Sequence, residues 1–102
     1  IVATADNAYR IAAGHGMRGE VVGTGCILGG TVASFCGGID DTLTAALHAT
    51  LAFGLVGERA ADDEYTGPAS YHTNLLDGIW NLTPEAASDL DVDLEDRVER
   101  IA

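Results

Sequence analysis

The feature that most constrains this chain is a run of nineteen residues, 21–39, without a charged side chain. Its length approaches that of a membrane-spanning helix. Six of the nineteen are glycine, including the adjacent pairs 29–30 and 37–38, and each glycine destabilises a helix interior by about 1 kcal/mol. We therefore interpret residues 24–36 as a helix buried by close packing on a sheet, and we expect no membrane partner.

The segment before this run predicts short β-strands. Residues 1–3 are apolar, Asp6 and Asn7 form a turn signal, and residues 9–12 alternate in polarity. Residues 21–22 predict one more short strand. Since position 1 is not Met and the chain opens within a strand-like run, we expect a piece of a longer protein.

Two further helices are predicted after the uncharged run. Asp40, Asp41 and Thr42 mark the start of a helix that extends to about residue 61 and is apolar on most sides, as buried helices are. Gly67 and Pro68 open another, which continues to about residue 82. The predicted fold class is α/β, with short strands followed by three packed helices.

The acidic tail, residues 83–102, gives mixed signals. Thr83, Pro84 and Glu85 are typical of a helix cap. Residues 90–94 alternate as in a strand, whereas the apolar spacing over residues 94–101 fits a helix, so both assignments stay open.

The charge balance excludes several classes of partner. Sixteen acidic residues and five basic residues give a net charge of −11, and every basic residue is arginine. The electrostatic field of such a negatively charged chain attracts neither nucleic acid nor an anionic membrane surface. A lysine-free acidic surface fits a protein that works in high salt, although genome base composition also removes lysine.

The cysteines and the N-terminal segment favour a cytoplasmic location. Cys26 and Cys36 do not make a disulfide framework, which fits a reducing compartment. Residues 1–22 carry four charged side chains and no continuous apolar run, so they do not resemble a secretory signal.

The segment Gly23-Thr24-Gly25-Cys26 carries the most chemistry. Two glycines let the backbone turn between a strand and a helix, with amides pointing outward at a helix N-terminus, and such a site prefers an anion. It can hold a phosphate, or the charge that develops on a phosphoryl group during transfer. Cys26 begins the helix, where thiolate is favoured and can act as a base or a nucleophile. The alternative is that Cys26 is a small apolar filler at a tight helix–sheet contact.

The chain has three histidines that are candidate catalytic partners or metal ligands. His15 lies in a loop and can approach Cys26 to form a nucleophilic pair, although nothing in the spacing requires it. His48 has no second ligand three or four residues away, so we expect a core or interface histidine. His72 receives no role. The two cysteines are ten residues apart on a predicted helix, which disfavours zinc, and no metal ligand is assigned.

The order of these motifs resembles a known family. Gly14-His15 and residues 21–28 are followed by an alanine-rich helix at 44–61 and then by the sequence Gly67-Pro68-Ala69-Ser70-Tyr71. Over residues 1–82 this order resembles the C-terminal part of hydroxyethylthiazole kinase.

The resemblance implies a fold, a reaction and an assembly. The fold is ribokinase-like, and the reaction is ATP- and Mg²⁺-dependent phosphorylation of the primary alcohol of 4-methyl-5-(2-hydroxyethyl)thiazole in thiamine biosynthesis. The assembly is a homotrimer with the thiazole site near a subunit interface.

The resemblance also implies roles for individual residues. Gly23, Thr24 and Gly25 would form the anion hole, with Gly23 also near the thiazole. Cys26 would stand where related kinases carry an aspartate base. Val22 departs from the threonine often found at its position, which bears on the geometry of the hole.

The resemblance covers less than half of the family's length. We therefore expect the chain to be the C-terminal segment of a single kinase domain and to be inactive alone. One alternative is a non-catalytic α/β fragment that serves packing and oligomer contacts. Another is a kinase for hydroxymethylpyrimidine, the other half of thiamine, which is disfavoured because Cys26 replaces the expected aspartate.

Overall fold

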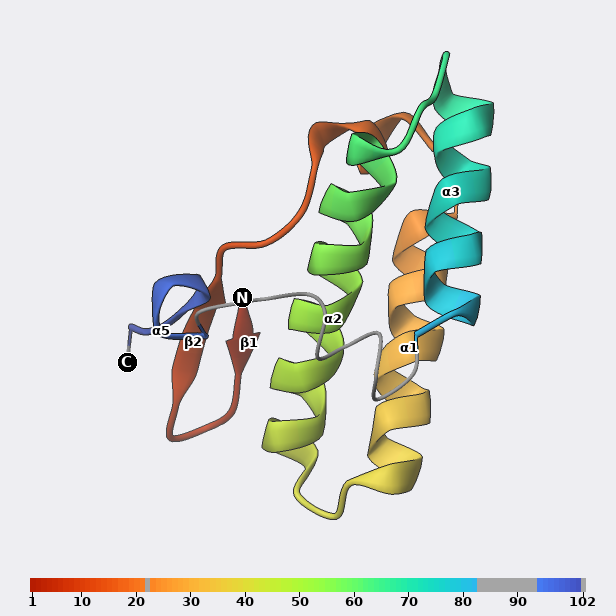
Figure 1. Ribbon diagram of the computed structural model, residues 1–102. Coiled ribbons are helices and arrows are strands. Elements are labelled where there is room, and N and C mark those ends of the chain that lie inside the picture. The colour runs from red at the N-terminus through yellow and green to blue at the C-terminus, as the bar shows by residue number, and fades with distance from the viewer. Residues whose placement is uncertain (22, 83–93, 102) are drawn as a thin grey trace.

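A computed structural model describes residues 1–21, 23–82 and 94–101 (Figure 1). Short strands and three long helices make up most of it, which confirms the predicted α/β class. In chain order the elements are β1 (Val2–Ala3), β2 (Ala8–Ile11), the 3₁₀ helix η1 (Gly16–Glu20), α1 (Thr24–Gly38), α2 (Thr42–Asp62), α3 (Pro68–Trp80), α5 (Leu94–Arg97) and β3 (Val98–Arg100).

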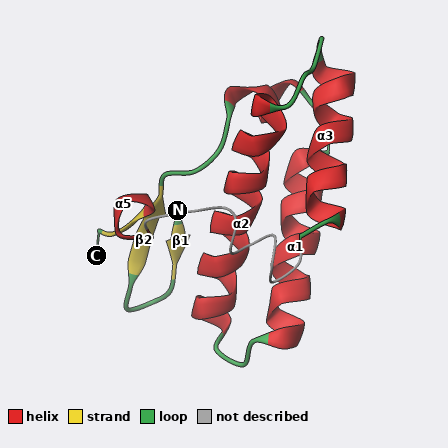
Figure 2. Ribbon diagram, viewed as in Figure 1, coloured by secondary structure: helices red, strands yellow, loops and turns green. Residues whose placement is uncertain are grey.

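Helix α2 lies at the centre of the molecule. The small sheet packs on one side of it, and α1 and α3 pack on the other (Figure 2). The main buried cluster joins α2 to α3 and to the segment before α1; it consists of Val21, Phe53, Val56, Ala60, Tyr71 and Leu75. Burial of α2 was predicted from its apolar surface and is confirmed.

The two short strands predicted near residues 1–3 and 9–12 are present, and they pair as an antiparallel hairpin. Val2 pairs with Tyr9 in antiparallel register. In the turn the N–H of Thr4 donates to the Asn7 carbonyl at 2.7 Å, and the Thr4 hydroxyl accepts from the N–H groups of Asp6 and Asn7. The turn expected at Asp6 and Asn7 is therefore confirmed.

Part of the acidic tail completes the sheet. Strand β3 pairs antiparallel with β2, so residues 98–100 form a strand and not a helix. Arg97, just before it, donates to both carboxylate oxygens of Glu58 on α2 at 2.8 and 2.9 Å and to the Ala12 carbonyl at 3.0 Å. The cap predicted at residues 83–85 lies outside the described residues.

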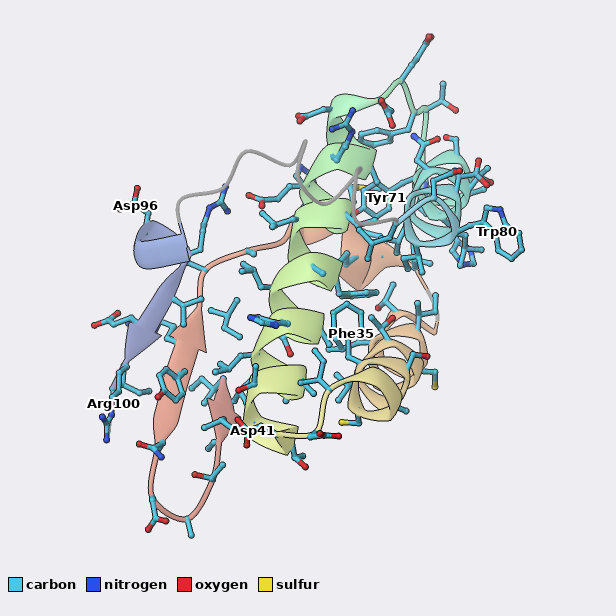
Figure 3. All side chains as sticks on the ribbon, turned by 60° about the horizontal axis from the view of Figure 1, so that its bottom comes forward. Phe35, Asp41, Tyr71, Trp80, Asp96 and Arg100 are labelled. Carbon is cyan, nitrogen blue, oxygen red and sulfur yellow. The ribbon has the colours of Figure 1, made fainter. Side chains whose placement is uncertain are left out.

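Helix α1 differs from its prediction in environment. It begins at the predicted residue and ends two residues later than expected, but none of its residues is buried, and it packs on α2 instead of a sheet. Its half-buried face includes Ile27, Val32 and Phe35, and Figure 3 shows Phe35 between α1 and α2. The small residues form the opposite, exposed face.

Two smaller predictions also change. Val21 is a buried residue in a bend instead of part of a strand, because η1 occupies the segment before it, and Val22 lies outside the described residues. His48 is exposed on α2, so it is not a core histidine. Among the described helices, none has the length and apolarity needed to cross a membrane.

Helix α2 begins where its acidic signal predicted. Asp41 is the N-cap, and its carboxylate accepts from the Thr44 hydroxyl and from the Thr44 N–H. These hydrogen bonds favour the charged carboxylate and lower the pKa of Asp41 from its usual value. The cap therefore satisfies a backbone donor that the helix itself leaves without an acceptor.

Gly54 allows α2 to touch the loop that leads to the candidate site. A Cβ at this position would lie 2.6 Å from the Ala13 Cβ and 2.8 Å from the Ala13 carbonyl oxygen. We expect Gly54→Ala to lower the free energy of unfolding by about 1–3 kcal/mol, because one of the two segments must shift. Urea denaturation measures this loss. Gly16→Ala is the matched control, since no heavy atom lies within 4 Å of its Cβ position.

Candidate functional site

The G-T-G-C segment forms the start of α1, as predicted. Gly23 is the N-cap, with a φ of 94°, a backbone conformation that favours glycine. The N–H of Ile27 makes the first helical hydrogen bond, to the Gly23 carbonyl at 3.0 Å. The N–H groups of Thr24, Gly25 and Cys26 precede that bond, so the helix supplies them with no acceptor. They can donate to an anion.

A cavity of about 340 Å³ opens beside this turn. Thr24 and Gly25 line it from α1, His15 and Arg18 from the segment around η1, and Phe53 from α2. No acidic side chain is among its lining residues. Gly23 and Cys26 do not line it, so only two of the four predicted site residues face this cavity.

The Thr24 side chain has a structural role. Its hydroxyl donates to the Arg18 carbonyl at 3.1 Å, and the Val21 N–H points to the same oxygen at 3.4 Å. These bonds fix η1 against the start of α1. Because the hydroxyl already donates to this carbonyl, Thr24 would contact an anion through its backbone N–H.

Cys26 is an exposed free thiol. It lies on the exposed face of α1, as does the other free thiol, Cys36. In this chain the residue is not a filler at a tight helix–sheet contact, which was the alternative interpretation. Its sulfur is open to a substrate that approaches the helix start.

His15 lines the cavity. Its Nδ1 accepts from the Met17 N–H at 3.1 Å, so the neutral ring carries its proton on Nε2. No hydrogen bond joins His15 to Cys26 in the described part of the chain, which gives the nucleophilic pair no support. Nor do residues 1–21, 23–82 and 94–101 contain a cluster of three or more His, Cys, Asp or Glu side chains that could hold a metal ion.

Arg18 is the cavity residue that the sequence reasoning missed. Its guanidinium carbon lies 5.1 Å from the centroid of the Phe53 ring, and its Nη2 lies 3.5 Å from the Ala13 carbonyl oxygen. The rarity of basic residues is the sequence signal that could have identified it. Arg18 is one of only five arginines in the chain, and it lies six residues before Thr24.

Known proteins are similar to this chain over most of its length. The family model described as the hydroxyethylthiazole kinase family matches residues 1–85. A protein from Haloquadratum walsbyi named hydroxyethylthiazole kinase is 54% identical over 99% of this chain. Proteins of the same name from Natronomonas pharaonis and Thermoanaerobacter pseudethanolicus are 49% and 51% identical over 99% and 71% of it.

These matches cover only part of each relative. The chain spans 35% of the Haloquadratum protein, 36% of the Natronomonas protein and 28% of the Thermoanaerobacter protein. The family match nevertheless extends over most of this chain and includes both motifs, G-T-G-C and G-P-A-S-Y. On this basis the chain belongs to the hydroxyethylthiazole kinase family.

Proposed function

We propose that the complete protein transfers a phosphoryl group from ATP to the primary alcohol of 4-methyl-5-(2-hydroxyethyl)thiazole, a reaction of thiamine biosynthesis. The observation that carries this proposal is the start of α1 in a member of this family: free backbone amides beside a cavity without acidic side chains. Such a surface suits the charge of a phosphate group.

In this proposal the backbone N–H groups at the start of α1 make the largest contribution to catalysis. The N–H groups of Thr24, Gly25 and Cys26 stabilise the charge on the transferring phosphoryl, and Gly23 gives the turn its shape and lies near the thiazole. Phosphoryl transfer is largely dissociative, so the alcohol loses its proton late. We assign the role of proton acceptor to the Cys26 sulfur; the alcohol oxygen bonds to phosphorus as the bond from phosphorus to the ADP oxygen breaks, and ADP leaves.

We propose Mg²⁺ as a cofactor of the complete protein and assign it to no residue of this chain. Kinases bind Mg²⁺ through one or two carboxylates together with the substrate phosphates. The described part of this chain has no side-chain cluster that fits a metal ion, so no catalytic step is assigned to one here.

We propose further that the chain is the C-terminal segment of one ribokinase-like domain, in a cytoplasmic homotrimer. The chain spans 35% of the Haloquadratum relative, which supports its being a segment of a longer domain. The exposed small-residue face of α1 and the exposed side chains of Leu76 and Trp80 offer surface for the rest of the domain or for a second subunit. Figure 3 shows Trp80 pointing away from the helices. The segment alone should then be inactive.

A turnover assay with Mg-ATP tests the proposal. The complete protein should phosphorylate hydroxyethylthiazole and not hydroxymethylpyrimidine, and the 102-residue chain should phosphorylate neither. Turnover of the pyrimidine alcohol alone would identify the other thiamine-precursor kinase. No turnover of either alcohol by the complete protein would favour the non-catalytic packing role.

A further inference from the structure

Arg18 holds a positive charge at the cavity without a carboxylate partner. Elsewhere in the described residues, Arg97 is paired with Glu58 at 2.8 Å, and Arg10 lies 3.8 Å from Glu99. Arg18 has no such ion pair within residues 1–21, 23–82 and 94–101, although acidic residues outnumber basic ones sixteen to five in the whole chain. Within the described residues, this half-buried side chain lies against the Phe53 ring, makes one long contact to the Ala13 carbonyl and interacts electrostatically with Tyr71.

The backbone around Arg18 leaves room for its side chain. A Cβ at Gly14 would lie 2.1 Å from Nη2 of Arg18, and a Cβ at Gly57 would lie 3.0 Å from its Cδ. Two glycines therefore leave the space that the arginine occupies. Gly14 also has a φ of 138°, which disfavours other residues there.

The polar groups around Arg18 are complementary to an anion. The cavity is also lined by His15, whose Nε2 carries the proton in the neutral ring, and by Thr24 and Gly25, at the positive end of the α1 dipole. An arginine binds phosphate oxygens through strong, charge-assisted hydrogen bonds. An incoming polyphosphate would thus supply the counter-charge that the described residues do not.

We propose that Arg18 binds the phosphate chain of the nucleotide. This inference rests on the proposed kinase function and adds a residue to it: the amides of α1 receive the transferred phosphoryl, and Arg18 holds the phosphates that stay on the nucleotide. Arg18 acts as a binding residue for ATP and does not contact the thiazole.

Arg18→Met in the complete protein tests the inference, because methionine keeps an unbranched chain for the Phe53 and Gly57 contacts but removes the charge. We expect the KM for ATP to rise about tenfold, while the KM for hydroxyethylthiazole stays within about twofold. Arg18→Lys should recover part of the ATP affinity. Salt screens these attractions, so all assays use one ionic strength.

The matched control is Arg59→Met. Arg59 is exposed on α2, does not line the cavity, and its removal changes the net charge by the same amount. The KM of the Arg59→Met variant for ATP should equal that of the parent. If Arg18→Met does not fold, as judged by circular dichroism, Arg18→Gln takes its place.

Direct binding of inorganic tripolyphosphate, measured by titration calorimetry, separates this inference from the proposed function. Loss of tripolyphosphate affinity in Arg18→Met supports the role of Arg18 even if the parent phosphorylates neither alcohol. An active parent whose Arg18→Met variant keeps both its KM for ATP and its tripolyphosphate affinity would overturn the role of Arg18 alone. A parent that neither turns over nor binds tripolyphosphate would overturn both.

Discussion

Replacing Cys26 by alanine is expected to lower kcat of the complete protein about 100-fold without abolishing turnover. A general base contributes about 10²–10⁴-fold, and a group that accepts a late-leaving proton belongs at the low end of that range. The alanine variant retains the N–H groups at the start of α1, so charge stabilisation persists. Steady-state turnover with saturating ATP and hydroxyethylthiazole measures the effect.

Two further variants make this result specific. Cys26→Asp keeps a base at the helix start and should retain activity. Cys36→Ala removes the other exposed thiol of α1, ten residues farther along, and should match the parent. A Cys26→Ala variant with the parent's kcat would show that the sulfur takes no part in proton transfer.

The helix starts could be predicted because each depends on a few neighbouring residues. Gly23 supplies the positive φ before α1, Asp41 caps α2 through Thr44, and Pro68 occupies the first turn of α3. Each feature is local in sequence, so residue preferences are enough to locate it. The position of the glycine turn at the start of α1 was predicted for the same reason.

The surroundings of the site could not be predicted in this way. The contact of Arg18 with Phe53 joins residues 35 positions apart, and the ion pair of Arg97 with Glu58 joins residues 39 positions apart. Neither contact leaves a periodic signal. The prediction that α1 is buried failed within the described chain because apolar character shows that a helix face can be covered, but not which segment covers it.

The G-P-A-S-Y motif was recognised only as a family signature, and the structure supplies a physical reason for it. The Ser70 hydroxyl accepts from the N–H groups of Thr66 at 2.9 Å and Gly67 at 3.3 Å, which fixes the chain before α3. Tyr71 follows directly and is fully buried between α2 and α3 (Figure 3). The motif thus starts a helix and anchors it to the core.

Tyr71→Ala is therefore expected to lower the free energy of unfolding by about 3–5 kcal/mol, the usual cost of removing a fully buried aromatic ring. The ring lies in the main buried cluster with Phe53 and makes an edge contact with Tyr65, at 5.6 Å between centroids. Urea denaturation followed by circular dichroism measures the loss. Such a change is a large part of the stability of a typical domain.

Tyr71→Phe separates the ring from its hydroxyl. The hydroxyl donates to the Gly57 carbonyl at 2.8 Å, and burial raises the pKa of Tyr71 against the opposing charge of Arg18, so the donor stays protonated at neutral pH. The phenylalanine variant should lose only about 1 kcal/mol, the net value of one hydrogen bond. Equal losses in the two variants would mean that the bond to Gly57, and not packing of the ring, attaches α3 to α2.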